Sequence, residues 1–185
     1  MSSHIVLLGP PASGKGVQSR LLSQRMSIPR ISTGELIRDV IKKNTTLSTF
    51  LEDIINAGNL IPDNILVELL MNKLKSINFK KGLIADGFPR TVTQAETFER
   101  LGFFKETNRK VFVLVADKNV LTDRLSKRAK EEHRQDDNSD VFQNRYNLYL
   151  KHLRELKKYY TDLVEINAET SVEKVNEQIV KYLCK

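Results

Sequence analysis

Residues 9–15 read GPPASGK, and they join a short apolar strand to an amphipathic helix. In that context the pattern G-x-x-x-x-G-K is typical of a phosphate-binding loop. Its glycines let successive backbone N–H groups turn inward towards a phosphate, and the start of the helix adds a partial positive charge. Lys15 is then placed to reach the β and γ phosphates. The stretch predicts a site for a nucleoside triphosphate.

Strand-like and helical patterns alternate along the rest of the chain. Apolar runs predict strands at residues 5–8, 82–85, 111–116 and 163–166, with a weaker candidate at 28–31. Helical periodicity predicts helices at residues 15–26, 62–76, 92–101, 118–130, 141–160 and 172–184. This order predicts an α/β fold in three layers, with a five-stranded parallel sheet covered by helices on both faces.

Two segments interrupt the alternation. Residues 33–59 carry two helical patterns in succession, at 35–43 and 47–57, with no strand between them, which indicates a small helical insertion. Residues 129–139 are almost entirely polar and cannot pack on a core. Composition favours a plain surface loop there, and a mobile lid over a ligand is the alternative.

Composition limits the range of functions. The 185 residues are 40% hydrophobic, enough for one sizeable core, and the formal charge of +7 favours a polyanionic partner. That partner is a nucleic acid, a membrane surface or a phosphorylated small molecule, but basic and acidic residues are interleaved, which argues against nucleic acid. No run of 18 apolar residues and no leader-like segment is present, so we expect a cytoplasmic protein. Cys184 stands alone, which excludes structural zinc of the thiolate type.

The loop departs from the usual pattern where magnesium is bound. Gly16 stands where a serine or threonine normally follows the lysine. Asp86 ends an apolar strand and is the best candidate to hold Mg²⁺, through bound water. Its alternative role is that of a turn residue at the strand end.

Further motifs lie beyond the loop. Residues 86–90 read DGFPR directly after a predicted strand, where ligands bind in open α/β sheets. Residues 31–38 read ISTGELIR, residues 123–128 read DRLSKR and residues 134–137 read RQDD. With these motifs in this order, the chain resembles the adenylate kinase family. The resemblance implies a P-loop kinase fold in one domain, 1–185, with a core at 1–32, 62–128 and 135–185, an NMP-binding insertion at 33–61 and a short lid at 129–134.

The resemblance also implies an AMP site. Thr33 and Gln94 match the adenine-specific versions of their motifs, so we expect AMP to be preferred over UMP, CMP and GMP. A side-chain amide can pair with both N1 and the amino group of adenine, and presents the wrong pattern to guanine. The AMP-binding residues implied are Thr33, Arg38, Asn59, Leu60, Ile61, Gly87, Phe88, Pro89, Arg90, Gln94, Arg134 and Arg145.

The donor site and the catalytic set follow from the same resemblance. The ATP-binding residues implied are Ala12, Ser13, Gly14, Lys15, Gly16, Val17, Arg124, Arg128 and Thr170. The catalytic residues implied are Lys15, Arg90, Arg124, Arg134 and Arg145. Asp136 and Asp137 are expected to pair with lid arginines as the lid closes.

These roles describe a phosphotransferase that moves the γ-phosphate of ATP to AMP, reversibly and with Mg²⁺, to give two ADP. In-line transfer needs position and positive charge rather than a covalent intermediate or a base. We expect a monomer with ATP, AMP and ADP as its partners. A kinase for UMP, CMP or another monophosphate is one alternative, and a P-loop protein that only binds nucleotide is another.

Two positions depart from the family pattern. Relatives usually have glycine at the position of Ala12, so we expect Ala12 to have a negative φ or to accept mild strain. They usually have threonine at the position of Val17, and the lost hydroxyl would otherwise meet the α-phosphate. The segment 167–170 is only a loose match to the family segment near the donor adenine. We therefore expect weaker ATP binding than in relatives.

Overall fold

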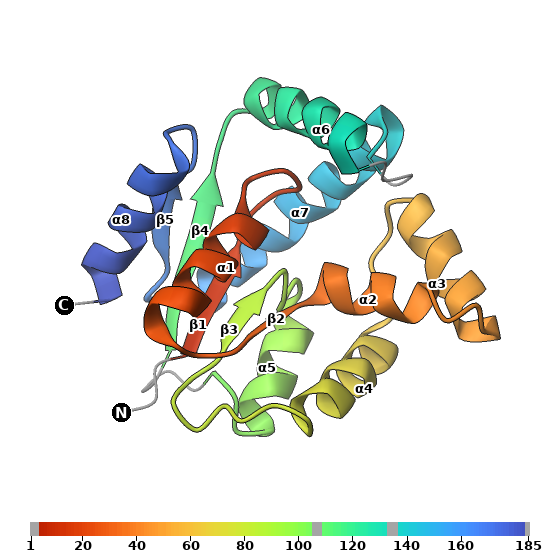
Figure 1. The fold of residues 1–185 in the computed structure, drawn as a ribbon, viewed down its shortest axis with the longest axis horizontal. Helices are drawn as coiled ribbons and strands as arrows, with labels where there is room; N and C mark the ends of the chain where they lie inside the picture. The colour runs from red at the N-terminus through yellow and green to blue at the C-terminus, as the bar shows by residue number, and fades with distance from the viewer. Residues whose placement is uncertain (1–3, 105–108, 133–136, 184–185) are drawn as a thin grey trace.

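A five-stranded, fully parallel sheet forms the centre of the molecule (Figure 1). The computed structural model describes residues 4–104, 109–132 and 137–183. The strand order is β2-β3-β1-β4-β5. The strands are β1 (His4–Leu8), β2 (Arg30–Ser32), β3 (Ile84–Asp86), β4 (Arg109–Val115) and β5 (Val164–Asn167). The predicted five-stranded parallel sheet is confirmed, including the weak candidate that became β2.

Helices separate the strands along the chain. They are α1 (Lys15–Met26), α2 (Thr33–Ile41), α3 (Thr46–Asn56), α4 (Asp63–Leu74), α5 (Val92–Arg100), α6 (Lys118–Glu132), α7 (Ser139–Tyr159) and α8 (Val172–Leu183). As predicted, α2 and α3 follow one another with no strand between them. They project from the edge of the sheet that carries β2 (Figure 1).

The prediction of a plain loop over residues 129–139 was wrong at its start. Residues 129–132 belong to α6, which ends at Glu132 rather than at the predicted residue 130. Ala129, Lys130 and Glu131 are strong helix formers, so the helix extends without needing a buried face. Residues 133–136, including the last two residues of the expected lid, lie outside the described residues.

Side chains alternate between the two faces of the sheet, as a strand requires. Ile5 and Leu7 of β1 face a core formed with α1 and α8, where Leu22 and Ile179 are fully buried. Val6 and Leu8 face the opposite core, which α4, α5 and α7 cover with residues such as Leu70. Burial on both faces explains why the strands read as continuous apolar runs.

The central position of β1 determines where a ligand can bind. Its neighbours are β3 on one side and β4 on the other, and Leu7 pairs with Asp86 in register. The carboxyl ends of β1 and β3 therefore meet at one edge of the sheet, where the chain leaves in opposite directions. Such switch points form crevices in open α/β sheets.

Side chains cap the starts of α3, α5 and α7, but not the start of α1. Thr45 and Ser48 form a capping box at α3, Thr91 accepts from the Gln94 N–H at α5, and Asn138 accepts from the Val141 N–H at α7. The N-cap of α1 is Gly14, which carries no side-chain cap. The first N–H groups of α1 are left for another acceptor. Within the described ranges, no helix is both long and apolar enough to cross a membrane.

Leu22→Ala tests the packing of α1 on the sheet. Leu22 is fully buried, so we expect the free energy of unfolding to fall by about 2–5 kcal/mol, the usual cost of this truncation in a core. Urea denaturation measures the loss. Leu47→Ala makes the same truncation at a site that is 38% exposed and should change stability by no more than about 0.5 kcal/mol. Equal losses in the two variants would contradict the assigned core.

Candidate active site

A cavity of about 470 Å³ lies at the carboxyl ends of β1 and β3. Its walls come from the loop after β1, the segment after β3, the insertion, and helices α6 and α7. Most residues predicted for the site line it: Ala12, Ser13, Gly14, Lys15, Gly16, Val17, Thr33, Arg38, Asn59, Leu60, Ile61, Asp86, Gly87, Pro89, Arg90, Gln94, Arg124, Arg128, Arg145 and Thr170. The structure brings together residues that the sequence spreads over more than 150 positions.

Two predicted residues are not among them. The side chain of Phe88 is fully buried in the core and packs against Phe98 and Phe104, with ring centroids 5.1 and 5.8 Å away. An aromatic ring in an apolar cluster is a packing residue, so the Phe88 side chain does not reach the cavity. Arg134 lies outside the described residues, as does Asp136.

The loop at residues 9–15 is shaped by left-handed backbone. Gly9 has φ of +151°, and a Cβ there would come within 2.8 Å of Ser13 Oγ and 2.9 Å of the Leu114 carbonyl oxygen. Only glycine fits. Ala12 has φ of +63°, so the expected negative φ is wrong and the strain alternative holds. A left-handed alanine costs about 1–2 kcal/mol relative to ordinary backbone.

The loop surrounds the ammonium group of Lys15, its last residue. Its ammonium donates to the carbonyl oxygens of Gly9 at 2.9 Å and Pro10 at 2.7 Å, and to Ser13 Oγ at 3.3 Å. Burial lowers the pKa of Lys15 to about 8; Asp86 opposes the shift, and the nearby cations Arg90 and Arg128 reinforce it. The loop thus holds a cation whose charge is poorly compensated, which favours an anion.

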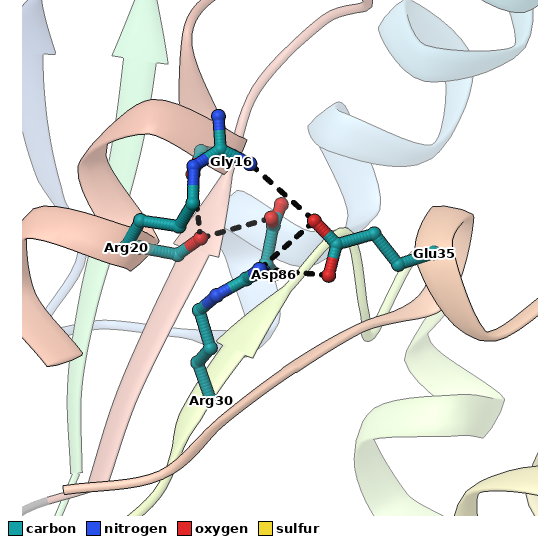
Figure 2. A network of polar contacts seen from close by, with 6 residues as sticks. Gly16, Arg20, Arg30, Glu35 and Asp86 are labelled. Carbon is teal, nitrogen blue, oxygen red and sulfur yellow. Dashed lines mark hydrogen bonds and ion pairs between the residues drawn. The ribbon is translucent and has the colours of Figure 1, made fainter.

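Asp86 lines the cavity. It lies close to Gly16 at the start of α1 (Figure 2). Its Oδ2 accepts from Ser19 Oγ at 3.0 Å, and the same hydroxyl lies 3.1 Å from the Gly16 carbonyl oxygen. A Cβ at Gly16 would be 3.6 Å from Asp86 Oδ2. The missing serine or threonine side chain would therefore have lain next to Asp86, and Asp86 remains the candidate residue for holding a metal ion.

An ion-pair network connects α1, β2 and α2 next to Asp86. Arg20 and Arg30 converge on the carboxylate of Glu35, at 3.4 and 2.8 Å (Figure 2). Glu35 belongs to the insertion, whereas Arg20 belongs to the phosphate-loop helix. The network ties the base of the insertion to the loop, although Arg20 and Glu35 are well exposed and contribute little stability.

The insertion side of the cavity is built around Thr33. Its Oγ1 donates to the Gly87 carbonyl oxygen at 3.1 Å. Gly87 has φ of +81°, and a Cβ there would come within 2.9 Å of that hydroxyl. A Cβ at Gly34 would lie 3.3 Å from the guanidinium nitrogens of Arg38, so this arginine extends across the glycine. Glycine is favoured at position 87 by its positive φ and this close approach, whereas at position 34 the flexible Arg38 side chain could move aside.

The remaining arginines reach the cavity from separate elements. Arg90 Nε donates to the Gly87 carbonyl oxygen at 2.8 Å, Arg124 donates to the Ala168 carbonyl oxygen at 2.7 Å, and Arg145 donates to the Ile55 carbonyl oxygen at 2.9 Å. Burial lowers the pKa of Arg90 to about 10; Arg145 reinforces this and Asp86 opposes it. Arg128 makes a two-point contact with Asp137, at 2.6 and 2.5 Å.

The balance of charge identifies the class of ligand. Among the described residues that line the cavity, seven are cationic and two are carboxylates. The cations are Lys15, Arg20, Arg38, Arg90, Arg124, Arg128 and Arg145, and the carboxylates are Glu35 and Asp86. Cations crowded against one another are stabilised by a bound polyanion. The cavity therefore suits a ligand with several phosphate groups.

Comparison with known proteins agrees with this geometry. A family model described as adenylate kinase matches residues 7–164. An adenylate kinase of Azobacteroides pseudotrichonymphae is 41% identical over 184 residues, covering 96% of this chain and 95% of the relative. One from Cyanothece sp. is 37% identical, covering 85% and 82%, and one from Kocuria rhizophila is 34% identical, covering 98% of each chain.

The chain belongs to the adenylate kinase family. Adenylate kinases are phosphotransferases of the nucleoside monophosphate kinase type, so the predicted enzyme class is confirmed. All three relatives are named adenylate kinase rather than kinases for another monophosphate, and neither alternative identity is favoured.

Several residues of this adenylate kinase cavity were not predicted from the sequence. Ser19 contacts Asp86, and it lies one helical turn beyond Lys15. Tyr149 and His152 line the cavity from α7, four and seven positions beyond Arg145. Residues four and seven positions apart lie on one face of a helix. The predicted site residue Arg145 could therefore have indicated Tyr149 and His152 from the sequence.

The lowered pKa of Lys15 predicts a pH dependence of stability. Between pH 8 and its ordinary value of 10.5, the unfolded chain binds more protons at Lys15 than the folded protein does. Stability therefore rises with pH over that range, and the cost of burying the ammonium is fully present below pH 8. We expect the free energy of unfolding of the wild type, relative to Lys15→Met, to increase from about pH 8 to about pH 10.5.

Urea denaturation at a series of pH values measures this difference. Lys181→Met removes an exposed lysine near the end of α8 and serves as the control. Its difference from the wild type should stay flat over the same range. A flat difference for Lys15→Met as well would mean that the ammonium is solvated rather than buried.

Proposed function

We propose that this cavity transfers the γ-phosphate of ATP to AMP, in a reversible Mg²⁺-dependent reaction that gives two ADP. The observation that carries the proposal is the placing of cations from five separate parts of the chain around one phosphate-binding loop. A protein that only binds a triphosphate needs the loop. A second set of arginines, on the insertion and on α7, is what a second phosphorylated substrate needs.

The donor half comprises the loop and the start of α1. The uncapped N–H groups after Gly14 and the ammonium of Lys15 bind the triphosphate, with Ala12, Ser13, Gly16 and Val17 completing the cradle. Arg124, Arg128 and Thr170 also line the cavity and contact the rest of ATP in this proposal.

The acceptor half comprises the insertion and the segment after β3. Arg38 binds the AMP phosphate, and Thr33 supports Gly87 beneath it. The base lies against residues 59–61, and Gln94 pairs with adenine. This assignment follows from the resemblance to the family, and it is supported by the finding that these residues line the same cavity as the phosphate loop.

Transfer takes place between the two halves. Lys15, Arg90, Arg124 and Arg145 surround the position of the transferred phosphoryl group, and Arg134 belongs to the same proposed set. Charge on the phosphoryl oxygens in the transition state is then compensated by fixed guanidinium groups. Because Arg90 and Arg124 are already held by backbone carbonyl groups, little reorganisation is needed when the charge develops.

The carboxylates that line the cavity fit a magnesium ion that is bound mainly through water. Among the described residues, no group of three or more histidine, cysteine, aspartate or glutamate side chains could hold a metal. Mg²⁺ commonly keeps several waters and binds through one carboxylate and the substrate phosphates, which is the arrangement Asp86 offers. Bound there, Mg²⁺ would neutralise negative charge on the phosphates, and Asp86 would hold it through water. Ser19 fixes the Asp86 carboxylate for this role.

The insertion at 33–61 and the lid at 129–134 exclude water from the reaction in this proposal. Hydrogen bonds between α7 and the insertion support the role of the insertion. Asn144 Nδ2 donates to the Ala57 carbonyl oxygen at 2.7 Å, and Arg145 donates to the Ile55 carbonyl oxygen. These bonds hold the end of α3 against α7. Excluding water protects ATP from hydrolysis. The proposal also includes a monomer acting in the cytoplasm, without a nucleic-acid or membrane partner.

A coupled assay for ADP formed from ATP and AMP tests the function. We expect turnover with the wild type and a loss of several orders of magnitude in Lys15→Met, because the ammonium stabilises charge at the transferred group. Lys181→Met is the control and should retain wild-type turnover.

The acceptor is tested by replacing AMP with UMP, CMP and GMP at equal concentration. Higher turnover with UMP than with AMP would identify a pyrimidine kinase. Tight ATP binding with no ADP formed from any acceptor would identify a binding protein instead. Either result would overturn the proposal.

Val17→Thr tests the donor half separately. Val17 is 37% exposed and lines the cavity, and threonine differs from it only by one hydroxyl in place of a methyl group. The hydroxyl adds one hydrogen bond to the triphosphate, so we expect the KM for ATP to fall by about two- to tenfold. Steady-state kinetics with AMP held at saturation measure it. Val17→Ile keeps the branched shape without the hydroxyl and should show no decrease; a fall in both variants would contradict the argument.

A further inference from the structure

The side-chain amide of Gln94 is held between a donor and an acceptor. Its Oε1 accepts from the Arg90 backbone N–H at 2.7 Å, and its Nε2 donates to Asp63 Oδ1 at 2.7 Å. Gln94 is 1% exposed and lines the cavity, whereas Asp63 is not among the lining residues. The amide therefore faces the cavity while a carboxylate behind it holds one of its two ends.

Asp63 is itself held in place. It is the first residue of α4, directly after Pro62, and its Oδ2 accepts from Thr91 Oγ1 at 3.4 Å. Thr91 is the N-cap of α5 and also accepts from the Gln94 backbone N–H at 3.2 Å. These contacts close a ring that joins the starts of α4 and α5. The carboxylate is positioned by two helix ends rather than by a flexible loop.

An unrestrained amide does not distinguish adenine from hypoxanthine or guanine. Adenine presents an acceptor at N1 and a donor at its amino group, whereas the other two bases present a donor at N1 and an acceptor at O6. The prediction that a side-chain amide presents the wrong pattern to guanine therefore holds for one orientation only, because a half-turn about the last bond exchanges the oxygen and the nitrogen. The glutamine that pairs with adenine therefore gives specificity only if that half-turn is prevented.

Both neighbours of Gln94 prevent it. After a half-turn, Oε1 would face the Asp63 carboxylate, an acceptor against an acceptor, and Nε2 would face the Arg90 N–H, a donor against a donor. Both existing hydrogen bonds would be lost in a nearly dry environment, where unpaired polar groups are costly. Oε1 keeps its second lone pair and Nε2 its second hydrogen for a base.

We propose that Asp63 is a specificity-determining residue of the acceptor site, which fixes the Gln94 amide in the orientation that accepts adenine and rejects 6-oxopurines. It acts through Gln94 and is a positioning residue rather than a catalytic one. The inference rests on the proposed function, since it assumes that AMP occupies this half of the cavity.

The matched ligands for a test are AMP and IMP, which differ in the N1 and C6 groups that Gln94 faces. We use dissociation constants, because binding is measurable whether or not IMP is phosphorylated. Isothermal titration calorimetry gives the value for AMP, and displacement of AMP gives that for IMP. In Asp63→Asn the side chain keeps its shape, but its own amide offers either a donor or an acceptor to Gln94. We expect the preference for AMP over IMP to fall about tenfold, the effect of one charged hydrogen bond, with AMP binding weakened and IMP binding improved.

Two further variants separate this effect from loss of fold. Asp63→Ser removes the carboxylate but keeps a residue suited to a helix start, and it should lose the preference to a similar extent. Glu173→Gln removes a carboxylate from the first turn of α8, outside the cavity, and should leave the preference unchanged. Thermal unfolding of all variants shows whether they are folded at the assay temperature.

The outcomes distinguish the inference from the proposed function. If the wild type neither binds nor phosphorylates AMP, the proposed function fails. If the wild type binds AMP and IMP equally, or if both Asp63 variants keep the wild-type preference within twofold, the proposed function stands and the role of Asp63 is wrong.

Discussion

Mutual repulsion among cations at one edge of the sheet is the constraint on which the rest of the structure depends. Among the described residues, seven lysine and arginine side chains and two carboxylates line the cavity. Burial lowers the pKa values of Lys15 and Arg90, and neighbouring arginines add to this shift. A fold can keep such a cluster only if other contacts are strong. Here the two apolar cores on either face of the parallel sheet supply that stability, since β1 is buried on both sides immediately before the loop.

The way the cations are held explains why they remain available to a ligand. Lys15, Arg90, Arg124 and Arg145 all donate to backbone carbonyl oxygens. A carbonyl dipole orients a guanidinium or ammonium group without cancelling its charge, whereas a carboxylate partner would compete with phosphate. Arg128 and Arg20 differ, because the carboxylates of Asp137 and Glu35 hold them. For Lys15, Arg90 and Arg124, the carbonyl groups orient the cation before an anion binds, which is the arrangement that favours stabilisation of a transition state over simple binding.

The sequence was sufficient for the sheet, the helices and most of the cavity, because these depend on local patterns. Apolar runs and helical periodicity place each element to within about two residues, and the loop and DGFPR motifs mark the ends of β1 and β3. Three features of the structure could not be predicted from the sequence. The φ of Ala12 depends on how the whole loop closes, and the burial of Phe88 depends on Phe98 and Phe104, which pack against it only after folding. The extension of α6 to Glu132 reflects helix propensity overriding the polar composition that had indicated a loop.

The pairing of Asp63 with Gln94 belongs to the same class of long-range feature, at a separation of 31 residues. A motif can identify the side chain that faces a ligand, since that residue type is dictated by the ligand. It cannot identify the group behind that side chain, because many residues on many elements are able to supply a carboxylate there. Yet for an amide, whose two ends differ only by hydrogen-bonding character, the group behind decides which ligand is matched. Specificity in this cavity therefore depends on the packing of α4 against α5 as well as on the residue that faces the base.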